Sequence, residues 1–163
     1  ERGLWNNTII IVISDHGEEL FDHGDFGHKN FYDHTIHVPL IIHVPGMDGR
    51  VDVQNLIQSA DLLPTVLSIV EIDSPQNIDG QDQIAVLRGD ADPTQATYGI
   101  SFGKMYIRTK EWKYILNANG SEELYDLLLD PFERENLAKN QSFGDVRDNL
   151  RRLLDVWSSD SGS

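Results

Sequence analysis

Two runs of apolar, mostly β-branched residues dominate the hydrophobic pattern in the first third of the chain. The first is TIIIVIS at residues 8–14, and the second is VPLIIHVPG at residues 38–46, where Pro-Gly closes the run. Continuous apolar runs of this length are typical of strands buried on both faces, as in the parallel sheets of α/β proteins. The pattern therefore predicts two buried strands, and the first begins so near Glu1 that the chain reads as the middle of a larger fold.

The segment at residues 59–72, SADLLPTVLSIVEI, has apolar residues at helical spacing. Ser59 and Asp61 are both suitable N-caps, and Pro64 is tolerated in a first helical turn. We expect a helix that covers the sheet. From about Asp73 to Pro93 the spacing gives way to turn-forming residues, which indicates a surface crossing or a subdomain boundary.

After residue 91 the pattern becomes one of short strands. ATYGISF, KMYIRTK, WKYILNA and EELYDLL follow each other closely, separated by Gly, Lys-Glu or NANGS turns, and this predicts a small antiparallel sheet. The segment FGDVRDNLRRLLDVWSS predicts an amphipathic helix that packs on the sheet. Its apolar stripe contains Val146, Leu150, Leu153, Leu154 and Trp157.

We expect different environments for the aromatic and the basic residues of this C-terminal part. Core positions are predicted for Trp112, Tyr114, Tyr125 and Trp157, because they alternate along strands or fall on a helical stripe. Arg108 and Lys113 could reach a substrate, although a solvated edge of the sheet is the favoured interpretation.

The net charge of the chain restricts the partners that it can bind. With 13 Lys and Arg against 27 Asp and Glu, the chain has a formal charge of −14, which disfavours nucleic acid and anionic membrane surfaces as partners. An anionic substrate would need a bound cation or a local cluster of donors. The chain has no cysteine, which excludes disulfides and thiolate metal sites within it, and it has no apolar stretch of membrane-spanning length. The compartment stays open, with the cytoplasm as the expectation.

The chemistry concentrates where the first predicted strand ends. All six histidines lie between residues 16 and 43, among acids and glycines, and Asp15 and His16 follow the strand directly. Gly17 permits a turn that brings a carboxylate and an imidazole toward one point, where they can bind a divalent cation. Two ligands do not close a site. The alternative is a turn capped by Asp15, with the other histidines and the acids Glu18, Glu19, Asp22 and Asp25 as surface residues.

Several motifs in a fixed order resemble the sulfatases of the alkaline phosphatase superfamily. The stretch NTIIIVISDHGEELFDHGDFGHKNFYDHTIHVPLIIHVPG is similar to their strand ending in Ser-Asp-His-Gly, glycine-rich loop and Val-Pro-Leu strand. SADLLPTVLSIVEID with its later Asp-Gly resembles their Asp-(Leu/Phe)-x-Pro-Thr helix. YIRTKEWKYILNANGSEELYDLLLDPFERENLA resembles their C-terminal hairpin and its Asp-Pro-x-Glu-x-x-Asn-Leu sequence.

The resemblance implies a fold and a division of the chain. The expected fold class is α/β, the C-terminal part of an alkaline phosphatase-like mixed sheet with flanking helices, followed by a small antiparallel sheet packed by a C-terminal helix. Residues 1–90 would belong to the α/β catalytic domain, and residues 91–163 would form the small subdomain.

The resemblance also implies roles for particular residues. Asp15 and His16 would be ligands of a divalent metal (Ca, Mg, Mn or Zn), and His28 would contact the sulfuryl or phosphoryl group. The spacing favours His28, while Lys29 is the candidate if the loop shifts by one residue. Tyr32 and Asp33 could shape the pocket, although packing is favoured. The family's nucleophile, formylglycine within Cys/Ser-x-Pro-x-Arg, would lie upstream, so this chain alone is expected to be inert.

The resulting functional hypothesis is the C-terminal part of a metal-dependent sulfuric ester hydrolase. Its expected partners are a small-molecule sulfate ester and the rest of its own catalytic domain; nucleic acid and membrane are not expected, and the oligomeric state stays open. One alternative is a phosphatase, phosphodiesterase or phosphoethanolamine transferase of the same superfamily. The other is a non-catalytic interaction module.

Overall fold

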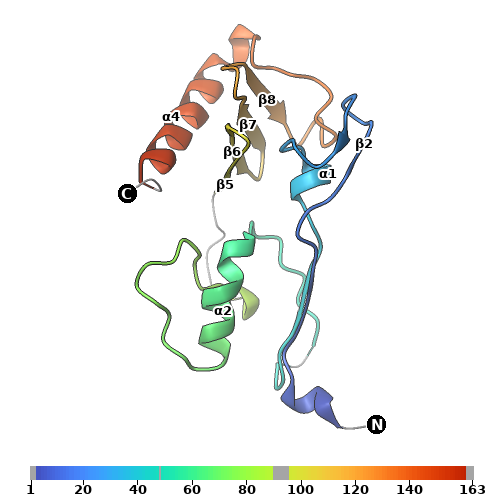
Figure 1. Cartoon of the computed structure of the whole chain (residues 1–163), viewed down its shortest axis with the longest axis vertical. Coiled ribbons are helices and arrows are strands. Elements are labelled where there is room, and N and C mark those ends of the chain that lie inside the picture. Colours follow the sequence, from blue (N-terminus) through green and yellow to red (C-terminus); the bar gives the residue numbers. More distant parts are fainter. Residues whose placement is uncertain (1–2, 48, 90–95, 161–163) are drawn as a thin grey trace. The chain divides into compact units, whose positions relative to one another are not determined.

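The computed structural model describes residues 3–47, 49–89 and 96–160, and the chain forms two compact units (Figure 1). One unit consists of Glu1–Gly17 and His37–Pro93, and the other of Glu18–Ile36 and Thr94–Ser163. The segment 18–36 therefore groups with the C-terminal strands. The expected division into domains near residue 90 concerns the organisation of the whole protein and stays a prediction.

The first unit contains an antiparallel pair of strands. Strand β1 (Ile10–Ile13) pairs with β4 (Leu40–His43), with Ile10 opposite His43 and Ile13 opposite Leu40. Both predicted strands are confirmed, but the expected burial on both faces is wrong for these residues. Three of the four β1 side chains are exposed in the described part of the chain. A 3-10 turn, η1 (Leu4–Asn7), precedes β1.

The predicted helix at residues 59–72 is present as a 3-10 turn, η2 (Ser59–Asp61), which runs into α2 (Leu62–Ile69). Pro64 lies in the first turn of α2, where its missing N–H costs no hydrogen bond. Asp61 is buried and accepts hydrogen bonds from the backbone N–H of Gln58 and of Gln81, at 2.9 and 2.8 Å. Asp61 thus ties the helix start to the Asp-Gly turn that follows 20 residues later.

The segment after α2 is largely irregular, as the turn-forming residues predict. It contains one short helix, α3 (Ile84–Leu87). The preceding residue, Gln83, is buried, and its backbone N–H donates a hydrogen bond to the Thr65 hydroxyl oxygen at 2.9 Å. Residues 90–95 lie outside the described part of the chain.

The second unit is built on the antiparallel sheet that the sequence predicts. Its strand order is β5-β6-β7-β8, and a long helix follows. The strands are β5 (Ala96–Ser101), β6 (Lys104–Thr109), β7 (Trp112–Leu116) and β8 (Glu122–Asp126). The predicted C-terminal helix is confirmed as α4 (Gly144–Asp160), preceded by a 3-10 turn, η3 (Gln141–Phe143).

The two faces of this sheet carry different layers (Figure 1). Helix α4 covers one face, where Ile107, Tyr114 and Leu124 pack with Leu150 and Leu154. The other face receives the segment that contains the short strands β2 (Glu19–Leu20) and β3 (Phe26–Gly27) and the helix α1 (Asp33–Ile36). The alternation of side chains along each strand therefore separates a helix layer from a loop layer.

The predicted aromatic core positions are confirmed, and they divide between the two layers. Tyr114 is fully buried under α4, where Trp112 and Trp157 also pack. Tyr125 is buried on the opposite face with Phe31. Trp157 stacks on Tyr98 with ring centroids 5.3 Å apart, so it joins the end of α4 to strand β5. In the described part of the chain, no helix is both long and apolar enough to cross a membrane.

Candidate metal centre and anion-contacting loop

Asp15 and His16 lie directly after the C-terminal end of β1, in a turn that their own side chains stabilise. The Asp15 Oδ1 atom accepts a hydrogen bond from the backbone N–H of His16 at 2.9 Å, and the Ser14 hydroxyl donates to the His16 carbonyl oxygen at 2.7 Å. The alternative that Asp15 caps a turn is therefore realised. It uses one carboxylate oxygen of Asp15 and leaves the metal-ligand hypothesis open for the other.

The geometry of this turn suits a divalent cation. The Nδ1 atom of His16 lies 2.7 Å from the Gly17 carbonyl oxygen, which can only accept, so Nδ1 is the donor and Nε2 is the ring nitrogen that would bind a metal. That Nε2 atom is 3.7 Å from Oδ2 of Asp15. Since metal–ligand distances are about 2.0–2.6 Å, two ligands of one ion can be separated by this span. Imidazole and carboxylate together fit Mn, Zn or Mg and admit Ca.

His28 and Lys29 follow strand β3 in the second unit, whereas Asp15 and His16 belong to the first. The His28 Nδ1 atom lies 3.5 Å from a carboxylate oxygen of Glu18, and both side chains are about half exposed. Lys29 is exposed. The preference for His28 over Lys29 as the anion contact stays a prediction.

Glu19 is buried, contrary to the expectation of a solvated acidic face. Only 2% of its surface is exposed, and its two carboxylate oxygens accept hydrogen bonds from the backbone N–H and the side-chain amide of Asn30, at 2.8 and 2.9 Å. Burial of a carboxylate is unfavourable unless donors replace its hydration. Nothing in the local sequence distinguishes Glu19 from its exposed acidic neighbours. Its burial follows from contacts with residues that are more distant in sequence.

A buried cluster of charges joins helix α1 to the sheet. The guanidinium of Arg108 binds Asp33 through two nitrogens, at 3.0 and 2.9 Å, and Lys113 also donates to Asp33. Lys113 is fully buried and lies 2.6 Å from Glu133. Glu133 accepts a hydrogen bond from the backbone N–H of Asp33 at 2.6 Å. The solvated edge expected for Arg108 and Lys113 is therefore wrong: both side chains serve as counter-charges to the segment that carries His28.

Electrostatics in this cluster favour the charged forms. Burial alone would raise the pKa of Asp33, but the hydrogen bonds and positive charges of Arg108 and Lys113 outweigh it and hold that pKa well below its usual range. Burial would lower the pKa of Arg108, and the Asp33 carboxylate reverses this and raises it. Both groups are therefore ionised at neutral pH.

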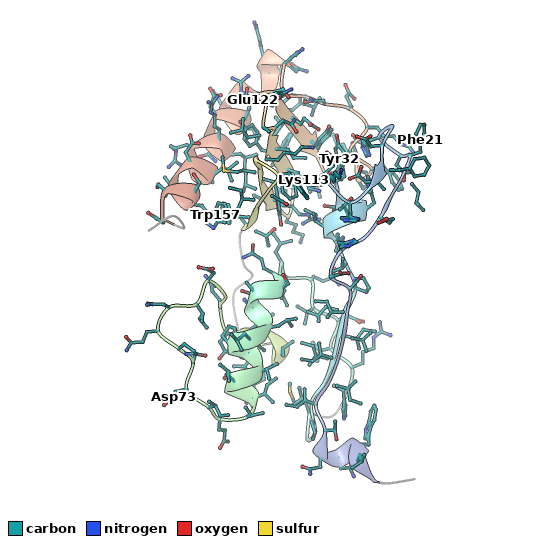
Figure 2. The ribbon with its side chains drawn as sticks, in the orientation of Figure 1. Phe21, Tyr32, Asp73, Lys113, Glu122 and Trp157 are labelled. Carbon is teal, nitrogen blue, oxygen red and sulfur yellow. The ribbon has the colours of Figure 1, made fainter. Side chains whose placement is uncertain are left out.

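Tyr32 packs against the sheet, as expected, and its hydroxyl joins a second polar cluster. Glu123 accepts hydrogen bonds from Tyr32 at 3.0 Å, from Tyr125 at 2.6 Å and from the Asn117 amide at 2.6 Å. Burial and the neighbouring Glu123 carboxylate raise the pKa of both tyrosines. The ring of His23 stacks on Tyr32 at 3.7 Å, and Figure 2 shows Tyr32 and Lys113 on the side of the sheet away from Trp157.

Three residues of the C-terminal motif DPFERENL have structural roles. Asp130 accepts a hydrogen bond from the backbone N–H of Glu135 at 2.8 Å, which closes the turn. Glu133 faces inward to the charge cluster from a left-handed backbone conformation, with φ of 57°. The Asn136 side-chain oxygen accepts from the N–H groups of Leu124 and Ala138, at 3.1 and 2.9 Å. The motif thus attaches the chain after β8 to the sheet and to α1 through hydrogen bonds.

Comparisons with known proteins agree with this architecture. Residues 21–159 match the family described as N-sulphoglucosamine sulphohydrolase, C-terminal. The chain is 32% identical over 152 residues to arylsulfatase K of Mus musculus, covering 83% of this chain and 28% of that protein. It is 34% identical over 168 residues to the Delta 4,5-hexuronate-2-O-sulfatase of Bacteroides thetaiotaomicron, covering 93% of this chain and 34% of that protein.

Among solved structures, the phosphonate monoester hydrolase of Agrobacterium radiobacter is similar, with a TM-score of 0.80 and 28% identity over 96% of this chain and 36% of that one. Sulfatase structures share the fold as well, so the expected fold class, α/β of the alkaline phosphatase-like type, is confirmed. The chain spans between 27% and 34% of the length of the curated relatives it matches. Sulfatases generally depend on a metal. The match over most of its length shows that the chain belongs to the sulfatases, as a C-terminal portion of the N-sulphoglucosamine sulphohydrolase type.

Proposed function

We propose that the full-length protein is a sulfuric ester hydrolase that cleaves sulfate monoesters, and that this chain contributes two metal ligands and one anion-contacting side chain to its active site. The observation that carries the proposal is the Asp15–His16 turn. Its two ligand atoms lie 3.7 Å apart, and the second ring nitrogen of His16 is anchored to the Gly17 carbonyl. Membership of the sulfatase family, matched over residues 21–159, supports the proposed reaction class.

In this proposal each residue has a defined task. Asp15 and His16 hold the divalent metal, which when bound supplies Lewis-acid stabilisation of the ester oxygens. His28, when protonated, donates a hydrogen bond to a nonbridging oxygen of the ester. The nucleophile, formylglycine, comes from outside these residues, since the chain contains no cysteine and no Ser-x-Pro-x-Arg sequence. We therefore propose that the chain is inert by itself.

The main partner in this proposal is the rest of the same catalytic domain. Val12 and Ile41 are exposed apolar residues on β1 and β4, and they lie opposite each other in the antiparallel pair. Exposed apolar strand faces are normally covered in a folded protein. We propose that further strands and helices of the full-length protein extend this pair into the mixed sheet of the alkaline phosphatase-like fold.

For the substrate we propose a small-molecule sulfate ester. Because one relative is named a hexuronate-2-O-sulfatase, sulfated uronate saccharides are the first compounds to assay beside aryl sulfates. A second candidate function is phosphonate or phosphate ester hydrolysis, which the likeness to a phosphonate monoester hydrolase favours. The same metal ligands serve both reactions, so the two candidates are separated by substrate preference and by the nucleophile.

The test uses the full-length protein with aryl sulfate, aryl phosphate and aryl phosphonate as parallel substrates. Asp15→Ala should abolish hydrolysis together with bound metal, measured by elemental analysis. His28→Ala should lower turnover while metal content stays near normal, and Lys29→Ala should have a smaller effect. Full activity in Asp15→Ala would remove this residue from the site. A larger loss in Lys29→Ala than in His28→Ala would reverse the assignment between these two neighbours.

A further inference from the structure

Glu19 is bonded to the chain on both sides of His28. In the β2–β3 pair Glu19 lies opposite Gly27, the residue before His28. Its carboxylate accepts two hydrogen bonds from Asn30, the second residue after His28. The turn that contains His28 and Lys29 is thus held before His28 by the strand pairing of Glu19 and after Lys29 by the Glu19 carboxylate.

Asn30 connects this carboxylate to the sheet. Its side-chain NH2 donates to Glu19, and its side-chain oxygen accepts a hydrogen bond from the ammonium of Lys104 on β6. Because one end of the amide faces a negative group and the other a positive group, only one of its two orientations satisfies both partners. The three side chains form a chain of hydrogen bonds from the His28 turn to the sheet.

Strand β6 contacts the segment after His28 at three positions on one face. Lys104, Tyr106 and Arg108 alternate along β6 and contact, in order, Asn30, Phe31 and Asp33. The rings of Tyr106 and Phe31 are 4.8 Å apart. Three successive attachments to one strand leave the backbone after His28 little freedom to shift.

Burial makes Glu19 unlike the other acids of this hairpin. Glu18, Asp22 and Asp25 are exposed, whereas Glu19 is 98% buried. A buried carboxylate costs free energy that a buried apolar side chain would not, and this cost is offset only by well-oriented donors. Here the donors orient the turn that carries His28.

We propose that Glu19, Asn30 and Lys104 are positioning residues that hold His28 in place for contact with the anion. The inference rests on the proposed function, in which His28 donates to an oxygen of the ester. None of the three residues needs to touch the substrate, because each acts through the backbone on either side of His28.

The test is a double-mutant cycle on kcat and KM in the full-length protein. Glu19→Gln preserves size but sets an amide NH2 against the donors of Asn30, and Asn30→Asp sets a carboxylate against Glu19. Each should lower kcat by about tenfold to a hundredfold while KM changes much less, as expected for a misplaced group that acts in the transition state. In a His28→Ala background the same changes should alter kcat by less than about twofold.

Asp22→Asn, an exposed acid in the same hairpin, is the matched control and should leave kcat unchanged. Lys104→Met, which removes the partner at the sheet end, should fold even if Glu19→Gln does not, because Lys104 is only partly buried. Metal content and Tm verify that each variant is folded.

Each outcome decides between the proposals. Unchanged kcat in Asn30→Asp and Lys104→Met would overturn the positioning role while leaving the role of His28 intact. Equal losses with and without His28 would also overturn it, since the three residues would then act on the fold in general. If His28→Ala alone has no effect, the anion contact of the proposed function fails, and the positioning role fails with it.

Discussion

The ammonium of Lys113 lies 2.6 Å from the carboxylate of Glu133, and both side chains are almost completely buried. Lys113 also donates to Asp33, which Arg108 binds with two nitrogens. Two cations of neighbouring strands thus compensate two carboxylates that are 100 residues apart in sequence. Arg108 and Lys113 are directly paired across β6 and β7, so without these carboxylates the two like charges would repel each other.

Lys113→Met should strongly destabilise the protein, because it leaves Glu133 buried without its cation. We expect a loss of about 3–5 kcal/mol in the free energy of unfolding, the usual cost of removing one member of a buried pair. Urea unfolding followed by circular dichroism measures it. Lys110→Met, in the exposed turn between the same two strands, is the control and should change stability by less than about 0.5 kcal/mol. Similar losses in both variants would contradict a special role for the buried pair.

The depressed pKa of Asp33 predicts a loss of stability in acid. In the unfolded chain this carboxyl has a pKa of about 3.9, whereas in the folded protein its pKa lies well below that value. The folded state thus binds the proton less readily, so Asp33 adds stability above about pH 4 and loses it as the pH falls through the folded pKa. Unfolding free energies measured between pH 7 and pH 2 should show the advantage of wild type over Asp33→Asn shrinking below pH 4. A pH-independent difference would contradict this assignment.

Two glycines with different surroundings give a matched pair of substitutions. A Cβ atom on Gly80 would lie 2.0 Å from the Ala60 carbonyl oxygen, so Gly80→Ala should destabilise by about 1–3 kcal/mol through a clash between backbone segments. A Cβ on Gly144 meets nothing within 4 Å, and its φ of −56° is helical. Gly144→Ala should therefore stabilise by about 0.4–1 kcal/mol. Thermal unfolding of both variants checks the opposite signs.

Metal removal should lower the stability of the full-length protein. A metal that binds only the folded state stabilises it by about 2.7 kcal/mol when its concentration is a hundred times Kd. Chelation should thus lower Tm, and added Mn or Zn should restore it. In Asp15→Ala neither treatment should shift Tm, whereas Asp25→Ala, with an exposed acid elsewhere in the loop, should respond like wild type. A normal metal response in Asp15→Ala would exclude this carboxylate as a ligand.

Local patterns in the sequence were sufficient to predict the longer elements of the fold, but not the short elements β2, β3, α1 and α3. Each of the longer elements is recognised from the spacing of apolar residues over a short stretch of sequence. They are the strands in the runs at 8–14 and 38–46, the helix after Ser59, the four C-terminal strands and the C-terminal helix. Tyr114 and Tyr125 could be placed in the core for the same reason. The burial of β1 was predicted wrongly for the described residues, because side-chain burial depends on the layers that pack against the two faces of a sheet and not on the strand's own residues.

The buried charges could not be predicted, because their partners are remote in sequence. Glu19 has the same neighbours in sequence as Glu18. It differs in the structure because it accepts a hydrogen bond from Asn30, which in turn accepts one from Lys104 on the sheet. Lys113 did carry a signal: it alternates with Trp112 and Tyr114 and so shares its face with Ile115, which a solvated face would not favour. The metal ligands and His28 were identified by resemblance, and their roles stay predictions.

The attachment of segment 18–36 to β6–β8 and Glu133 also sets the order of events when the protein is made. At ribosomal rates of about 5–20 residues per second, Glu133 is synthesised about 5–20 s after Asp33. During that interval His23, Tyr32 and Asp33 have none of the sheet partners that hold them in the finished protein. The segment that carries His28 therefore reaches its final conformation only after Glu133 has been synthesised, and a product terminated before Glu133 would contain the residues of the loop without its structure.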